Sequence, residues 1–385
     1  MAARAGAAQE LVLVGGGHSH ALALRALALQ PVAGVRTTLV SPARHTPYSG
    51  MLPGLIAGHY QFEHTHIDLL RLCRWAGVRF VAAPVVALDP RARRLTLGDS
   101  TTIVYDVLSI DIGSQPELDS VPGAREHAVP VKPVAGLWQR WQAVYARLQA
   151  RPAGQSDCRI AVVGGGAGGV ELAMAMAARL AGRGVRVALW CAGPVLLPGY
   201  NRCARRAVQR ALVHQGVAVH VNARVERVRP DRLMTADGRG ADYDELFWCT
   251  GAVAAPWVAA SGLRTDASGF LQVRDTLQAL DDDRVFAAGD IAAQVAHPRP
   301  KAGVYAVRQA PVLAHNLRAA LLGEPLREYR PQRSFLSLVS LGGKRATAAR
   351  GPLSVTGAWV WRWKDRIDRA FMARFTDLPA RPARD

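Results

Sequence analysis

Apolar residues along this chain repeat one order: a short apolar run, a glycine turn, then apolar residues at helical spacing. Residues 11–14 are four apolar residues in succession, and three glycines follow at 15–17. Apolar residues recur at helical spacing from 21 to 29, so the segment predicts a buried strand, a tight turn and a helix. The same order returns between residues 160 and 180. The repeat predicts an α/β fold with two Rossmann-like dinucleotide-binding units.

The glycine turns indicate the kind of ligand. A helix that starts directly after such a turn offers free N–H groups and the positive end of its dipole to a pyrophosphate. Gly15 and Gly17 match the first two positions of the G-x-G-x-x-G pattern, but His20 replaces the third. The third glycine normally lets helix and strand pack closely, so His20 predicts a wider approach or a side chain used near the ligand. The second turn has all three glycines, Gly164, Gly166 and Gly169.

The remaining pattern supplies further elements around these two units. Apolar runs and alternation predict strands at 36–40, 79–88, 95–97, 102–112 and 186–190, and a buried strand from Arg284 that ends in Gly289-Asp290. Helical spacing predicts helices at 69–75, 134–149, 304–322 and 357–375. Turn formers and aromatic residues from His45 to Tyr60 predict a loop that runs over a bound ring system.

Composition sets the broad class of protein. The chain has 385 residues with 50% hydrophobic content, which is enough for two or three domains with sizeable cores. The formal net charge of +18 comes from arginine, because lysine occurs only at Lys132, Lys301, Lys344 and Lys364. The arginines are spread along the whole sequence, so no nucleic acid partner is expected. Affinity for an anionic membrane or an anionic ligand stays open.

Neither a targeting segment nor a spanning segment is expected. The residues before Leu11 are too few and too poor in apolar side chains for a signal peptide. No run of about 18 apolar residues avoids charges and glycine motifs, so a membrane-spanning helix is not expected. These features predict a cytoplasmic protein.

Sulfur and metal chemistry have little support in the sequence. The cysteines contain no C-x-x-C or C-x-x-x-x-C pair, and they lie at Cys73, Cys158, Cys191, Cys203 and Cys249. A disulfide framework, a zinc site and a dithiol redox centre are therefore not expected. The segment EHTHID, residues 63–68, offers possible metal ligands, but no second ligand cluster lies at a recognisable spacing. We expect solvated side chains before a helix, and no metal.

The positions that normally bind ribose carry no acid in either unit. An acidic residue usually follows the second strand of such a unit and accepts hydrogen bonds from the adenosine ribose. Ser41 stands there in the first unit, so Ser41 with Arg44 is expected to hold that ribose. Cys191 ends the corresponding strand in the second unit, and Arg202, Arg205 and Arg206 follow. NADH and NADPH both stay open.

Five motifs in this order resemble a known superfamily. GGGxxx, YDxLxIxxGS, GGGAGGVE, CTGA and VFAAGD occur between about Leu11 and Leu322, as in the FAD/NAD(P)H oxidoreductases with two dinucleotide-binding domains. The lack of paired cysteines after the first unit separates the chain from the disulfide reductases. It resembles type II NADH dehydrogenase-like proteins most. In GGGHSH, HTPYSGMLPG and WVWRWKDRID it is also similar to the flavoprotein module fused to selenophosphate synthase in some bacteria, although this sequence contains no such partner domain.

The resemblance implies a role for each motif. Gly15 and Gly17 would hold the FAD pyrophosphate, Gly289 and Asp290 the ribityl chain, and the three glycines of the second turn the pyrophosphate of NAD(P)H. Glu171 would reach toward the nicotinamide. Lys301, just before the helix at 304–322, would act with that helix N-terminus to stabilise anionic reduced flavin, unless it is only a surface lysine. The remaining candidates for cofactor contact are His18, Ser41, Arg44, Pro53, Gly113 and Gly251.

The resemblance also implies a division of the chain and a reaction. An FAD domain would comprise residues 1–122 and 270–325, an inserted NAD(P)H domain residues 123–269, and a C-terminal cap or interface region residues 326–385. The expected activity is an FAD-dependent NAD(P)H oxidoreductase that passes hydride from NAD(P)H to FAD and on to a quinone or another small acceptor. Val304 and Arg308-Gln309 depart from the polar residues that quinone-reducing members place there, which weakens quinone as acceptor.

Two alternatives remain beside that activity. The chain resembles sulfide:quinone oxidoreductases in Pro300-Lys301-x-Gly303, which would imply sulfide or selenium-compound oxidation. Those enzymes need a cysteine pair beside the flavin, and no cysteine follows Cys249. A non-catalytic flavoprotein that binds NAD(P)H and a protein partner is the other alternative. Intact Glu171 and both glycine turns argue against it.

The tail from Gly357 to Phe375 predicts a helix that is aromatic on one side and basic elsewhere. Its apolar residues fall at spacings of three and four, at Trp359, Trp363, Ile367, Ala370 and Phe371. Such a helix fits a peripheral contact with the inner face of a membrane. We favour instead a helix that packs Trp and Phe onto the FAD domain and covers the flavin or forms a dimer contact.

Overall fold

The computed structural model describes residues 8–152 and 157–381. Residues 1–7, which form most of the segment judged too short for a signal peptide, lie outside the described residues. Within the described residues, no helix has both the length and the apolar character needed to cross a membrane.

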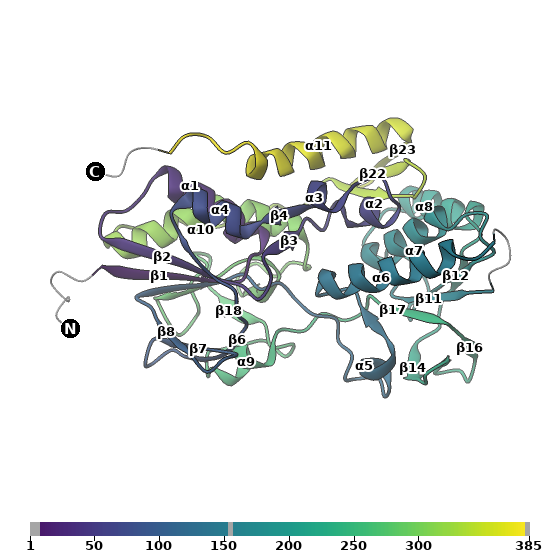
Figure 1. Ribbon diagram of the computed structural model, residues 1–385, viewed down its shortest axis with the longest axis horizontal. Helices are drawn as coiled ribbons and strands as arrows, with labels where there is room; N and C mark the ends of the chain where they lie inside the picture. The colour runs from purple at the N-terminus through teal and green to yellow at the C-terminus, as the bar shows by residue number, and fades with distance from the viewer. Residues whose placement is uncertain (1–7, 153–156, 382–385) are drawn as a thin grey trace.

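The first sheet is fully parallel, in the order β19, β9, β1, β2, β5 (Figure 1). Its strands are β19 (Val285–Ala287), β9 (Val107–Ile110), β1 (Gln9–Val14), β2 (Val35–Val40) and β5 (Arg79–Val81). Helix α1 (His18–Leu29) packs against α10 (Gly303–Leu322) and α4 (Leu69–Ala76), and Figure 1 shows the three on one side of the sheet. The predicted strand at 102–112 is two strands, β8 (Thr102–Val104) and β9.

Strand β1 is buried on both faces, as its uninterrupted apolar run predicts. Leu11 and Leu13 pack in one core with Leu24 and Leu313 of the helices. Val12 and Val14 point the other way because side chains alternate along a strand, and they pack in a second core. That second core is closed by α9 (Pro256–Ala260) and an antiparallel sheet of β6 (Val85–Asp89), β7 (Arg94–Leu97) and β8.

The second sheet is also parallel, in the order β10, β17, β11, β12, β13. Its strands are β10 (Val129–Pro130), β17 (Glu245–Trp248), β11 (Arg159–Val163), β12 (Arg186–Trp190) and β13 (Ala218–His220). The helices of this unit are α5 (Ala124–His127), α6 (Val134–Gln149), α7 (Ala167–Arg179) and α8 (Arg202–His214). A separate antiparallel sheet joins β14 (Val225–Val228), β15 (Arg232–Thr235) and β16 (Gly240–Asp242). The predicted α/β class with two Rossmann-like units is therefore confirmed.

Short elements fill the expected loop at residues 45–60 and its surroundings. They are β3 (His45–Pro47), α2 (Leu52–Ile56), α3 (Phe62–Thr65) and β4 (His66–Asp68). After α9 the chain forms β18 (Leu271–Val273), which pairs with β20 (Ala292–Gln294), and the 3₁₀ turn η1 (Gly289–Ile291) lies between β19 and β20.

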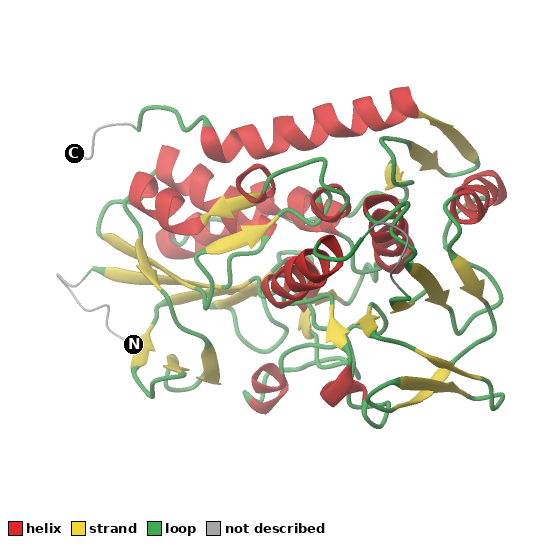
Figure 2. Ribbon diagram, turned by 45° about the vertical axis from the view of Figure 1, so that its right-hand side comes forward, coloured by secondary structure: helices red, strands yellow, loops and turns green. Residues whose placement is uncertain are grey.

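The C-terminal region forms a meander and a long helix. Strands β21 (Ser337–Ser340), β22 (Ala346–Arg350) and β23 (Leu353–Gly357) pair antiparallel, and α11 (Ala358–Thr376) follows at once. Figures 1 and 2 show α11 as a long helix along one edge of the molecule, above the first-unit helices.

The predicted tail helix is present, but its apolar residues divide between two faces. The face toward the protein buries Val360, Lys364, Asp368, Phe371, Met372 and Phe375, which follow one another at helical spacing. Trp359 is 52% exposed, and Trp363 and Ile367 are each 39% exposed. The expectation that the tryptophans at 359 and 363 pack on the first unit is therefore wrong, because other residues occupy that face. Phe371 does pack there, in the same core as Leu11.

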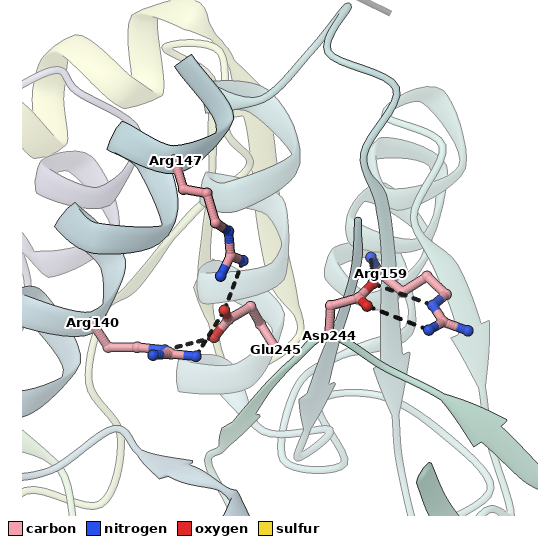
Figure 3. A network of polar contacts seen from close by, with 5 residues as sticks. All are labelled: Arg140, Arg147, Arg159, Asp244 and Glu245. Carbon is pink, nitrogen blue, oxygen red and sulfur yellow. Dashed lines mark hydrogen bonds and ion pairs between the residues drawn. The ribbon is translucent and has the colours of Figure 1, made fainter. Parts of the chain in front are cut away.

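A buried carboxylate joins α6 to the second sheet (Figure 3). The side chain of Glu245 on β17 is 1% exposed, and it accepts hydrogen bonds from Arg140 at 2.7 and 2.9 Å and from Arg147 at 2.8 Å. Both arginines project from α6, and both are about half exposed. The preceding residue, Asp244, accepts from the backbone and side chain of Arg159 on β11. The two carboxylates thus attach neighbouring elements on either side of β17.

Replacing the buried member of this network should destabilise the second unit. We expect Glu245→Gln to lower the free energy of unfolding by about 2–3 kcal/mol, because three charged hydrogen bonds from the two arginines lose their ionised acceptor while the half-exposed arginines regain water. Urea denaturation measures the change. Asp119→Asn removes the exposed pair with Arg125 and should have almost no effect. Equal effects of the two variants would contradict the role given to burial.

Candidate functional site

The carboxyl ends of three neighbouring strands bring the predicted first-unit residues together. Val14 of β1 pairs with Ile110 of β9, and Ile110 pairs with Ala287 of β19. Because the three strands are parallel, the segments that follow them lie side by side. These segments are Gly15–Gly17, Asp111–Ser114 and Gly289–Asp290. Ligands of open parallel sheets bind at this edge.

The first glycine turn is tight and leads directly into α1. Gly15 has φ +92°, a conformation that favours glycine, and its N–H donates to Val40 O at 2.8 Å. Gly17 is the N-cap of α1, which begins at His18, three residues before the predicted start. The helix N-terminus therefore lies at the ligand-binding edge.

His20 is part of the protein interior. Its ring is fully buried, with Nδ1 2.7 Å from Gly15 O and Nε2 2.8 Å from Ser109 Oγ. Burial lowers the pKa of His20 to about 4, so the ring is neutral at ordinary pH. The ring therefore joins α1 to β1 and β9, and both of its nitrogens are bonded inside the fold rather than left for a ligand.

Asp111 is a site residue that the sequence reasoning missed. It is 2% exposed and accepts the N–H of His20 at 3.1 Å, with further bonds from the backbone and hydroxyl of Ser19. Burial raises its pKa to about 7. A Cβ at Gly17 or at Gly289 would overlap the Asp111 carboxylate, so this acid requires both glycines. The sequence feature that could have identified Asp111 is an acidic residue directly after a buried strand, in SIDIGS.

Asp290 is the centre of a charged cluster. Its Oδ2 accepts from Lys132 Nζ at 2.9 Å and from Ser114 Oγ at 3.0 Å. Burial alone would raise the pKa of Asp290, but the Lys132 charge and these hydrogen bonds hold it below its usual value. A cavity of about 310 Å³ lies beside the cluster, lined by Asp290, Lys301 and Tyr305 among others. Lys132 was also missed, although it is one of four lysines in an arginine-rich chain.

His18 and Lys301 lie near this cluster without bonding to Asp290. His18 Nε2 is 3.2 Å from Pro47 O, and its ring meets Tyr48 and Phe371 edge to face. Burial lowers the pKa of His18. Lys301 donates to Ala292 O at 3.0 Å, and its Nζ is 3.8 Å from the centre of the Phe270 ring. Lys301 is thus half-buried and bonded within the fold, and burial lowers its pKa.

The second glycine turn has the geometry that its sequence predicts. Val163 of β11 pairs with Trp190 and with Trp248, so the segments after three parallel strands again meet at one edge. A Cβ at Gly169 would overlap Gly164 O, which explains the third glycine as close packing of helix on strand. Gly166 is the N-cap of α7, and a Cβ there would meet no atom within 4 Å. The front of this helix N-terminus is open to a ligand.

The two ligand-binding edges face each other. The segments that cross between the units pair through Gln115 and Val253, with N–H···O distances of 2.9 Å in both directions. Gly251 has φ +70° and lies against Glu117, since a Cβ there would be 2.6 Å from Glu117 Cβ. Gly113 has φ +71° and faces open space. The Lys132–Asp290 ion pair then joins the end of β10 to the end of β19.

Glu171 lies on α7 at this interface, covered by the C-terminal region. Its Oε1 accepts the N–H of Ser340 at 2.6 Å. Burial raises the pKa of Glu171 to about 7, while the Lys364 charge opposes the rise. The carboxylate is therefore poised to change charge near neutral pH. The sequence predicted its place on the helix but not the strand that covers it.

A buried ion pair of α11 adjoins Glu171. Lys364 Nζ and Asp368 Oδ2 are 2.5 Å apart, and the two side chains are 8% and 6% exposed. Lys364 also donates to Gly50 O at 2.5 Å, and the Tyr48 hydroxyl bonds to Asp368. Sequence reasoning missed both residues, although their i, i+4 spacing is typical of a helix ion pair.

The remaining predicted contact residues are held by partners inside the fold. Ser41 Oγ donates to Ala43 O at 3.0 Å, and Arg44 forms a two-pronged ion pair with Asp68. The pair raises the pKa of Arg44 and lowers that of Asp68 to about 2. Pro53 is buried in α2, which packs on α7 of the second unit. Ser41 follows Val40, whose carbonyl accepts the Gly15 N–H, so it stands beside the first glycine turn. The ribose contact expected of Ser41 and Arg44 stays a prediction.

Cysteines and possible metal ligands are scattered. No cysteine of the described residues forms a disulfide, and among the same residues no group of three or more His, Cys, Asp and Glu is placed to hold a metal ion. In the segment at 63–68, His66 stacks on Phe62 with ring centres 3.8 Å apart, and Asp68 caps α4.

The overlap between Gly17 and Asp111 gives a test of the first turn. We expect Gly17→Ala to lower the free energy of unfolding by about 1–3 kcal/mol, because its Cβ meets the Asp111 carboxylate. In an Asp111→Ala background the same change should cost less, with a coupling of roughly 0.5–3 kcal/mol in a double-mutant cycle measured with urea. Gly136→Ala, in open space on α6, should instead stabilise by up to about 1 kcal/mol. Additive effects at Gly17 and Asp111 would contradict the overlap.

Several proteins of known sequence are similar to this chain. An NADH dehydrogenase-like protein of Mycobacterium tuberculosis is 31% identical over 225 residues, which are 57% of this chain and 56% of that protein. A type II NADH:quinone oxidoreductase of Haemophilus influenzae is 31% identical over 229 residues, 54% of this chain and 51% of that protein. The chain thus spans about half the length of these two relatives. An NADH dehydrogenase-like protein of Bacillus subtilis is 24% identical over 92% of this chain and 99% of its own length.

Solved structures share the fold over nearly the whole chain. NDH2 from Plasmodium falciparum, solved in complex with NADH, superposes with a TM-score of 0.79 over 97% of this chain and 99% of that chain, at 14% identity. The sulfide:quinone oxidoreductase of Aquifex aeolicus superposes with a TM-score of 0.78 over 98% and 93%, at 20% identity. At these identities the likeness establishes the fold alone.

The family is established by its sequence profile, which matches residues 9–310 and so includes both glycine turns, Glu171 and Asp290. The family match confirms the predicted superfamily and, at this level, the expected cofactor class, FAD with NADH or NADPH. This chain belongs to the pyridine nucleotide-disulphide oxidoreductase family.

Proposed function

We propose that this chain is an FAD-dependent NAD(P)H oxidoreductase that delivers electrons to a small acceptor of the quinone type. The observation that carries the proposal is the facing of the two ligand-binding edges. Two parallel sheets present glycine turns and helix N-termini toward one interface, which Glu171 and Asp290 border. One cofactor in each edge would meet its neighbour there. The relatives named NADH dehydrogenase-like or NADH:quinone oxidoreductase support this reading.

The residues present fit the two cofactors. Gly166 leaves the front of α7 open, as a pyrophosphate requires. The cavity beside Asp290 and the open space at Gly113 suit the hydroxylated chain of FAD. FAD, when bound, supplies the hydride chemistry between NAD(P)H and the acceptor. The chain's own part is to hold and orient the two cofactors and to exclude water from the site.

The predicted division of the chain belongs to this proposal. The FAD domain would comprise residues 1–122 and 270–325, the NAD(P)H domain 123–269, and the cap 326–385. Ala254, Val258 and Leu263 pack in the same core as Val12, so the last part of the NAD(P)H segment also supports the first unit.

The residues near Asp290 bear on the identity of the acceptor. Gln309 lines the cavity beside Asp290, but its Oε1 is engaged within the fold because it accepts the N–H of Gly289 at 2.8 Å. Val304 is apolar. Sulfide or selenium-compound oxidation lacks its cysteine pair, since no cysteine of the described residues lines the cavity that holds Asp290 and Lys301. A non-catalytic role has no observation in its favour. We therefore keep a quinone-like acceptor and identify it by experiment.

Flavin reduction tests the proposal. The protein should purify yellow with noncovalent FAD, and NADH or NADPH should bleach it in stopped-flow. Ionised Glu171 would stabilise the positive charge that the nicotinamide gains, so we expect the rate to rise with pH through about 7. Glu171→Gln should remove that rise and slow reduction by roughly 10-fold at high pH.

Glu63→Gln, an exposed glutamate of α3, is the matched control and should behave as wild type. A colourless protein that stays without FAD when FAD is in excess would sink the cofactor assignment. The same pH profile in wild type and Glu171→Gln would sink the role of Glu171 alone. An acceptor screen with the flavoprotein then ranks quinones against other small acceptors.

The exposed apolar face of α11 supports a peripheral membrane contact, which we propose in place of the expected packing of Trp359 and Trp363 on the FAD domain. Trp359, Trp363 and Ile367 continue onto β23, where Leu353 is 76% and Val355 is 47% exposed. Arg362 and Arg366 are exposed on the same helix. Aromatic and basic residues together suit the interface of an anionic membrane. A homodimer contact through the same face is the competing outcome.

Replacing the exposed tryptophans tests this face without disturbing the buried one. Trp359→Ser with Trp363→Ser should abolish salt-sensitive flotation with vesicles that contain phosphatidylglycerol, while FAD content stays unchanged. Val86→Ser with Val104→Ser, exposed valines on β6 and β8, should float as wild type does. Light scattering on the same samples detects a dimer. Flotation that is absent in wild type, or unchanged in the tryptophan variant, contradicts the membrane contact.

A further inference from the structure

Lys132 occupies an unusual position between the two units. It follows β10, the edge strand of the second sheet, whose Pro130 pairs with Trp248. Its Nζ nevertheless bonds to Asp290, which follows β19 of the first sheet. The ion pair therefore spans from the ligand edge of one sheet to that of the other. The side chain of Asp290 is 17% exposed, whereas Lys132 is 41% exposed.

The hydrogen bonds of Asp290 are arranged on one side of its carboxylate. Lys132 Nζ and Ser114 Oγ both contact Oδ2, at 2.9 and 3.0 Å, and they contact each other at 3.1 Å. No hydrogen bond from the described residues reaches Oδ1. One oxygen is thus fixed by the protein and the other is left for a ligand. A carboxylate held in this way can accept from a hydroxyl without first giving up a partner.

We propose that Lys132 is a positioning residue for the flavin, which acts through Asp290 by fixing Oδ2 so that Oδ1 accepts a hydroxyl of the FAD chain. Because Lys132 belongs to the second unit, the same contact ties the position of that unit to the flavin site. This inference rests on the proposed function, and it adds a residue that none of the glycine or acid motifs includes.

Other charged groups lie near Asp290, and the test has to account for them. Lys301 lies close enough to favour the ionised carboxylate, and His18 and Asp111 both sense its charge. Asp111 has a pKa of about 7, so it titrates in the same range as the experiment. Wild type and the Lys132 variants all contain Asp111, so the difference between their FAD affinities at each pH removes the contribution of Asp111.

FAD affinity of the apoprotein, measured by flavin fluorescence between pH 5.5 and 8, tests the proposal. Lys132→Met should weaken FAD binding by about 10-fold or more, the loss of one charge-assisted contact. The loss should grow as pH falls, because burial then favours protonated Asp290 once Lys132 is gone. Lys132→Arg should restore most of the affinity and the wild-type pH profile. Lys344→Met, an exposed lysine of the C-terminal region, is the control.

The outcomes separate this inference from the proposed function. Wild-type protein that binds no FAD would defeat the proposed function. FAD binding by wild type with an unchanged affinity and pH profile in Lys132→Met would overturn only the role of Lys132. A merely structural role would lower the urea stability of the apoprotein and leave the FAD affinity untouched. Lys132→Gln, which keeps a polar side chain of similar reach, provides the same comparison should the methionine variant fail to fold.

Discussion

The parallel pairing of β1 with β9 and of β9 with β19 determines where the functional segments of this protein lie. Parallel strands place their carboxyl ends at one edge, so segments that follow residues 14, 110 and 287 become neighbours although they are far apart in the chain. The second sheet repeats the arrangement after residues 163, 190 and 248. Everything that bears on cofactor binding depends on these two edges and on their facing each other.

The first edge achieves its close packing in an unusual way. A histidine ring replaces the third glycine of the turn, and Ser109 on β9 together with Gly15 O satisfies both ring nitrogens. The acid at Asp111 then occupies the space under Gly17 and Gly289 and accepts N–H groups at the start of α1. Buried polar groups are stable only when they are hydrogen-bonded. His20, Ser109 and Asp111 therefore form one set, in which each residue explains the presence of the others.

Sequence reasoning recovered the elements whose pattern is local. β1, β2, β11 and β12 appear within a few residues of their predicted bounds, because a strand buried on both faces is an uninterrupted apolar run. The glycine turns and the helix carrying Glu171 were also predictable from spacing. The meander β21–β23 was not predicted, since its strands are short and its apolar positions weakly marked. Lys132 could not be assigned a partner, because Asp290 is 158 positions away in the chain and only the assembled sheets bring them together.

The two faces of α11 show that a helical pattern alone does not predict which face of a helix is buried. Trp359, Trp363 and Ile367 have the spacing of a buried stripe, yet a stripe that starts one residue later, at Val360, is the buried one. That inner stripe contains Lys364 and Asp368, charged residues that a hydrophobic pattern assigns to solvent. Burying an ion pair is stabilising only if additional hydrogen bonds satisfy both groups, and Gly50 O and the Tyr48 hydroxyl supply them. The helix is therefore oriented by a polar contact with the loop that precedes α2, and Trp359 and Trp363 are left outside as a consequence, while Trp361 packs on the first-unit core.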